Sequence, residues 1–168
     1  MDPLLDEKLI LTASASLIDV TSEQLGVYAV REAYGPTSNE GLCFEYCVKF
    51  PFQGKPNGNF YFAMDGYTKL QLIPYVVRNF LSEDDSAPKA IADKALFTMA
   101  KEVANMMEEE LKEFQEEFCF EEGKILSHKI EKLPSASFRK YMIIFFLKDN
   151  YRKKYLGRIY LVLALKKS

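Results

Sequence analysis

The order of apolar patterns along the chain predicts an α+β protein in which an antiparallel sheet of about six strands packs against long helices. Strand-like segments follow one another in two groups of three with no helix between them, which disfavours a parallel, doubly wound sheet. Three segments with helical spacing flank these groups. The chain has 168 residues, 48% of them hydrophobic, which suffices for one core. We therefore expect a single domain over residues 1–168 with the order α-β-β-β-α-α-β-β-β.

The N-terminal part is predicted to form one helix and three strands. Apolar residues recur near a 3.6-residue period over 4–25, and Gly26 follows as a C-terminal cap. Strand patterns then cover 27–34, 42–50 and 59–64, and a proline- and glycine-containing turn separates the last two. We expect these three strands to form an antiparallel meander.

Two helices and three further strands are predicted after the meander. Residues 67–81 have helical spacing, and Pro74 is expected to kink this helix or to mark its true start. A longer helix begins near Pro88 and continues to about residue 117, since neither glycine nor proline interrupts it. Strand-like segments follow at 118–131, 138–148 and 155–165. Residues 159–165 suit either a sheet edge or a central strand.

The charge balance argues against polyanionic partners. The chain has 22 basic and 24 acidic residues and a formal net charge of −2, so neither nucleic acid nor an anionic membrane surface is an expected partner. No apolar run approaches the roughly 20 residues that span a bilayer, and the N-terminus is acidic where a signal peptide would be basic. We expect a cytoplasmic protein.

Cysteine and histidine offer little for a metal site. Cys43, Cys47 and Cys119 include no C-x-x-C pair, and two strand residues four apart lie about 13 Å from each other. We expect free thiols. His128 is the single histidine, so a histidine-rich zinc site is excluded; it remains a weak candidate for a general base, since no nucleophile motif lies near it.

The long helix carries two separate stripes. Glu102 and Asn105 lie about 60° apart around the axis and about 4.5 Å apart along it. Thr98 and Glu109 fall on the same stripe: around the helix axis, the other three residues all lie within about 40° of Thr98. Such a stripe is most often a solvated face. Asparagine, however, is a poor helix former in the interior of a helix, and no local cap or turn explains Asn105 here. The apolar stripe comprises Leu96, Met99, Val103, Met106, Met107 and Phe114.

Two segments carry a family resemblance. Gly58-Asn59-Phe60-Tyr61-Phe62 looks like a glycine-led central strand, and Glu102-Val103-Ala104-Asn105 is an E-x-x-N signature preceded by Thr98, where serine or aspartate is common. In this order of elements, the chain resembles the CheC/CheX/FliY group of chemotaxis phosphatases over nearly its whole length. CheC and FliY carry two such signatures, and the first helix here has none, so CheX is the better match.

The resemblance implies a phosphatase that hydrolyses the aspartyl phosphate of a CheY-type response regulator. Glu102 and Asn105 would be the catalytic residues: Asn105 would orient the attacking water and Glu102 would bind a lysine of the regulator. Thr98 and Glu109 would be partner-binding residues. The resemblance implies no cofactor of its own, Mg²⁺ supplied by the receiver domain, and a homodimer joined through sheet edges. The alternative is a non-catalytic receiver-binding or flagellar-associated adaptor. Unlike the family pattern, Met107, Glu108 and Glu109 follow the asparagine where small residues are common.

Overall fold

The structure is a computed structural model that describes residues 3–38, 41–42, 44–80, 88–126, 131–132 and 137–167. The helices are α1 (Pro3–Val20), α2 (Gly66–Phe80) and α3 (Pro88–Lys112), and a π-helical turn η1 (Thr21–Leu25) follows α1. The strands are β1 (Tyr28–Pro36), β2 (Gly41–Leu42), β3 (Tyr46–Gln53), β4 (Gly58–Met64), β5 (Cys119–Phe120), β6 (Lys124–Ile125), β7 (Glu131–Lys132), β8 (Phe138–Asp149) and β9 (Lys154–Lys166).

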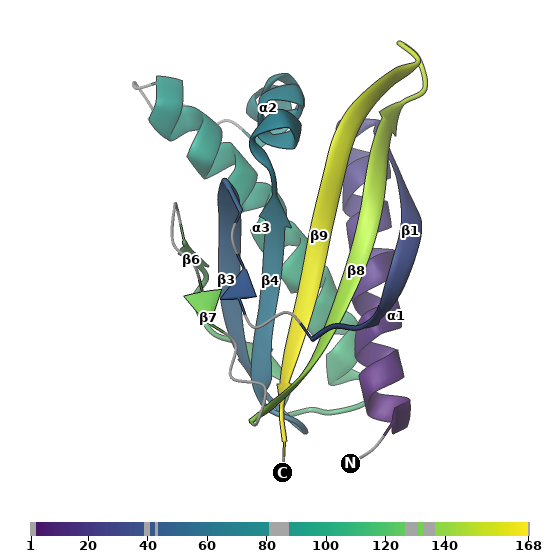
Figure 1. Cartoon of the computed structure of the whole chain (residues 1–168), viewed down its shortest axis with the longest axis vertical. Coiled ribbons are helices and arrows are strands. Elements are labelled where there is room, and N and C mark those ends of the chain that lie inside the picture. Colours follow the sequence, from purple (N-terminus) through teal and green to yellow (C-terminus); the bar gives the residue numbers. More distant parts are fainter. Residues whose placement is uncertain are drawn as a thin grey trace.

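One antiparallel sheet of seven strands forms the centre of the molecule. Its order is β1-β8-β9-β4-β3-β5, and β6 also pairs with β3. The helices α1 and α3 lie across one face of this sheet (Figure 1). The short strands β2 and β7 form a separate two-stranded ribbon. The predicted α+β class and the antiparallel sheet packed on helices are confirmed.

The predicted meander of the first three strands is wrong. β3 and β4 form the expected hairpin, but β1 pairs with β8 at the opposite side of the sheet. The distribution of apolar residues explains this order. β9 is buried along most of its length and therefore occupies the centre between β8 and β4, whereas most side chains of β1 are exposed, as suits an edge. Of the two alternatives for residues 159–165, the central strand is correct and the sheet edge is not.

The predicted strand over 118–131 is replaced by shorter pieces. β5 and β6 pair with different parts of β3, and residues 121–123 between them are not in a strand. The break lies where Gly123 approaches the ring of Phe50: a Cβ there would be 2.5 Å from the ring. The aromatic rings of Phe118 and Phe120 pack on Phe52, which ties the segment to the sheet. His128 falls outside the described residues.

The helix ends differ in detail from the predictions. The first helix becomes a π-helical turn after Val20, and Gly26 caps it with φ of 68° and an N–H donated to Thr21 O. Pro74 lies inside α2 and does not begin it, because Asp65 starts this helix by accepting the N–H of Thr68 at 2.8 Å.

The long helix α3 ends at Lys112, earlier than the predicted residue 117. Residues 113–118 turn back towards the sheet instead, and the side-chain amide of Gln115 exchanges two hydrogen bonds with the backbone of Lys55, at 2.8 and 3.0 Å. Phe114 therefore leaves the predicted buried stripe: its side chain is exposed and lies 4.0 Å from the ammonium group of Lys8.

The main core lies between the sheet and the helices, and a smaller cluster occupies the other face of the sheet. Cys47 belongs to that smaller cluster and is buried, whereas Cys119 is half-buried, and neither forms a disulfide within the described residues. Both agree with the prediction, while Cys43 falls outside the described residues. Asp6 of α1, although buried, is paired with Arg139 of β8 and fixes the helix to the sheet.

Candidate functional site

The apolar side of α3 is buried as its periodicity predicts. Leu96, Met99, Val103 and Met107 have no exposed surface, and Met106 is half-buried. They face the core that α3 shares with the sheet and with α1 and α2. Burial of this stripe fixes the rotation of the helix, so it also decides which residues of α3 face outward.

The predicted polar stripe lies on the outer side of α3. Asn105 and Glu109 are exposed, whereas Thr98 and Glu102 are half-buried. The Thr98 hydroxyl donates to the backbone oxygen of Lys94 at 3.0 Å, so it is engaged within its own helix. Within the described part of the chain, the side chains of Glu102 and Asn105 form no hydrogen bond or ion pair. Their polar atoms are therefore available to water or to another molecule.

A hollow of about 310 Å³ opens beside Asn105. One wall is α3 and the other is the segment 120–123 that follows it in the sequence. Its charged lining residues are Lys101, Glu108, Glu121 and Glu122; one positive and three negative side chains leave a net charge of −2. Phe50, Phe97 and Phe120 provide an apolar floor. The hollow favours a partner group that combines positive charge with an apolar stem.

Glu108 lines this hollow and helps to shape it, and it is not among the site residues predicted from the sequence. Its carboxylate accepts the backbone N–H of Phe120 at 2.7 Å and lies 3.7 Å from the Lys112 ammonium group. It thereby holds the segment after α3 against the helix. Glu121 and Glu122 were also missed, because only the turn after Phe120 brings them alongside Asn105.

Contacts near the start of α3 also fix its position. Asp93 pairs with Lys69 of α2 at 2.9 Å, and its backbone oxygen accepts the Tyr46 hydroxyl at 3.2 Å. Burial, followed by the nearby negative charge of Asp93, raises the pKa of Tyr46. The hydroxyl therefore stays protonated and keeps donating to the helix. The contacts of Asp93 and of Gln115 therefore hold α3 near both of its ends, so that the polar stripe lies on a rigid helix.

Neither a metal site nor a membrane-spanning helix is found in the described ranges. No group of three or more His, Cys, Asp or Glu side chains among these residues is arranged to hold a metal ion. No helix in the part of the chain that the structure describes is long and apolar enough to cross a membrane.

Comparison with known proteins identifies the fold. No protein-family model and no curated protein sequence matches the chain. Solved structures do. The CheX chemotaxis protein of Desulfovibrio desulfuricans aligns with a TM-score of 0.73 and 14% identity, over 94% of this chain and 99% of that one. A CheC-like protein of Shewanella sp. PV-4 aligns with a TM-score of 0.66 and 11% identity, over 99% and 100% of the two chains.

A third structure is a complex of CheX with CheY, BeF₃ and Mg²⁺ from Borrelia burgdorferi. It aligns with a TM-score of 0.69 and 18% identity, over 96% of this chain and 97% of that one. The protein therefore has the fold shared by CheX and CheC-like chemotaxis proteins. The alignments cover nearly all of both chains, so the likeness extends over the fold as a whole.

Proposed function

We propose that the protein is a phosphatase that hydrolyses the aspartyl phosphate of a CheY-type receiver domain. The observation that carries the proposal is Asn105: an exposed amide with no hydrogen-bond partner among the described residues, on the outer face of α3, next to Glu102. A CheX-type fold and the CheX–CheY complex of Borrelia burgdorferi support a receiver domain as the partner.

The chemistry suits an asparagine. An acyl phosphate is already reactive, so hydrolysis requires mainly a water molecule held in line with the phosphorus atom. A carboxamide both donates and accepts hydrogen bonds, and it therefore orients water without competing as a nucleophile. Asn105 is the residue that orients the water in the proposed mechanism. Glu102 is the second site residue and binds a lysine of the receiver.

Thr98 and Glu109 flank these two residues along the same stripe and are assigned to partner binding. Glu109 is exposed and can meet the receiver directly, while the hydroxyl of Thr98 is held by its own helix, so its methyl group is the part left for contact. The protein needs no cofactor of its own, and the receiver domain supplies the Mg²⁺ that neutralises the phosphoryl group.

The proposed homodimer forms through a sheet edge. β9 is not available for this because strands lie on both of its sides. We therefore assign the contact to the outer edge of β1, which pairs with β8 alone in the part of the chain that the structure describes. Tyr28, Val30 and Tyr34 of β1 are exposed large residues. Light scattering at micromolar concentration tests this assignment: twice the chain mass supports it, and the mass of one chain contradicts it.

The function is tested by following the lifetime of phosphorylated CheY with and without the protein, in Mg²⁺-containing buffer. A faster release of inorganic phosphate that saturates with receiver concentration is the expected result. Binding of the receiver without any acceleration would contradict catalysis and favour the adaptor. Absence of both binding and acceleration would contradict the receiver as partner.

A further inference from the structure

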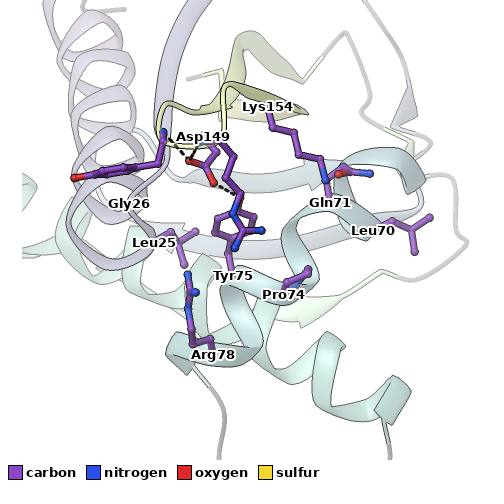
Figure 2. A pocket seen from close by; sticks show the side chains of 11 residues that line it. Leu25, Gly26, Leu70, Gln71, Pro74, Tyr75, Arg78, Asp149 and Lys154 are labelled. Atoms are coloured by element: carbon purple, nitrogen blue, oxygen red, sulfur yellow. Dashed lines mark hydrogen bonds between the residues drawn. The ribbon is translucent and has the colours of Figure 1, made fainter.

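A second hollow lies at the end of the molecule where α2 meets the turn between β8 and β9 (Figure 2). Its volume is about 450 Å³, within the range of roughly 300–1,000 Å³ typical of small-molecule sites. Leu25, Leu70, Pro74 and Tyr75 form its apolar wall. None of the residues assigned to the phosphatase site lines it, so it is independent of the proposed function.

Three cationic side chains converge on this hollow. Arg78 comes from α2, and Arg152 and Lys154 come from the turn and from β9. Figure 2 shows Arg78 and Lys154 extending into the hollow from opposite sides. All three are exposed, and none forms an ion pair with a carboxylate among the described residues. Arg78 lies 5.8 Å from the ring of Tyr75, at the boundary between the charged and the apolar parts.

The one carboxylate in the lining is already satisfied. Asp149 is buried and accepts the hydroxyl of Tyr75 and the backbone N–H groups of Tyr151 and Arg152, the latter two at 3.0 and 3.2 Å. The Tyr75 hydrogen bond and then the backbone donors hold the pKa of Asp149 below its ordinary value. Three positive groups against one negative group leave the lining with a net charge of +2. Asp149 therefore balances only part of the positive charge in the lining.

We propose that this hollow binds a small organic anion in which a phosphate group is joined to a flat apolar group. Arginine presents a planar fork that matches phosphate oxygens in a bidentate manner, and Arg78 and Arg152 supply two such forks with Lys154 as a third charge. Leu25, Pro74 and Tyr75 receive the apolar part. The cations cluster around one hollow and do not form a row, which suits a compact ligand better than an extended acidic peptide.

The test is a titration with phenyl phosphate, inorganic phosphate and a glutamate-rich peptide, followed by the amide NMR shifts of Gln71 and Lys154. Phenyl phosphate is expected to bind with one-to-one stoichiometry and at least about tenfold more tightly than inorganic phosphate, since only it fills the apolar part. Arg78→Gln and Arg152→Gln should each weaken it about tenfold. These residues are exposed, so their variants keep the fold.

Lys55→Gln is the matched control, because Lys55 is an exposed cation in the β3–β4 turn that does not line this hollow. Its affinity for phenyl phosphate should equal that of the wild type. No shift at Gln71 and Lys154, or equal weakening by all three substitutions, would overturn the proposal. Tighter binding of the peptide than of phenyl phosphate would also overturn it and would assign the hollow to an acidic protein segment.

Discussion

Asp6 of α1 and Arg139 of β8 are joined by two parallel hydrogen bonds, each 2.9 Å long, although 133 residues separate them. The Tyr141 hydroxyl donates a third bond to Asp6 at 2.7 Å. This is the bidentate geometry in which ion pairs are strongest, and it is buried at the helix–sheet boundary. The pair fixes the start of α1 against β8 through directional bonds. Hydrophobic packing is non-directional and would not by itself fix this position.

Replacing Asp6 with alanine should destabilise the fold by about 3 kcal/mol, because Arg139 and Tyr141 lose their shared acceptor in a buried place. Urea denaturation measures the change in free energy of unfolding. Glu7→Ala is the matched control, since Glu7 is the exposed neighbour on the same helix turn. The double variant Asp6→Leu/Arg139→Met should recover much of the loss, and equal losses in Asp6→Ala and Glu7→Ala would count against the pair.

The same pair predicts a dependence of stability on pH. Burial tends to raise the pKa of Asp6, but the hydrogen bonds from Arg139 and Tyr141 and the charge of Arg139 outweigh it, so the pKa is lowered. A carboxyl whose pKa is lower in the folded state stabilises the fold fully above its unfolded pKa of about 3.9. That contribution is lost as pH falls through the lower, folded value. Wild type should therefore lose more stability on acidification than Asp6→Ala; parallel curves would contradict this.

Gly157 is expected to tolerate no other residue. Its φ of 105° is unfavourable for an L-residue, and a Cβ would lie 2.1 Å from the Thr68 hydroxyl oxygen, which accepts the Arg158 N–H. Gly157→Ala should cost at least about 3 kcal/mol of unfolding free energy. Gly35→Ala is the control, because a Cβ at this β1 position meets nothing within 4 Å. Chemical denaturation of both variants should separate them clearly, and similar midpoints would refute the explanation.

Glu102 is expected to act in binding more than in catalysis. Glu102→Gln should weaken the complex with the phosphorylated receiver about tenfold and reduce its sensitivity to salt, because a charge pair across the interface is lost. Fluorescence anisotropy of a labelled receiver measures both effects. Glu110→Gln, at an exposed position of α3 outside the polar stripe, should leave affinity unchanged. A Glu102 variant with wild-type affinity would remove this residue from the interface.

The parts of the fold that depend on local periodicity were predictable from the sequence. The rotation of α3 follows from the spacing of Met99, Val103 and Met107, and that spacing alone places Asn105 on the outer face. The strand order was not predicted from local patterns, since β1 pairs with the distant strand β8 and not with the strands that follow it in the sequence. The same holds for Glu108 and for the pairing of Asp6 with Arg139, which join distant segments.

Phosphate release from phosphorylated CheY by the Asn105→Ala variant tests the role of Asn105. Alanine is a better helix former than asparagine and the position is exposed, so the variant should fold at least as well as the wild type. The turnover number of this variant should fall by at least about a hundredfold, with receiver affinity little changed, because a positioned water is lost. Glu110→Ala should retain full activity. Unchanged turnover in Asn105→Ala would show that Asn105 does not orient the attacking water.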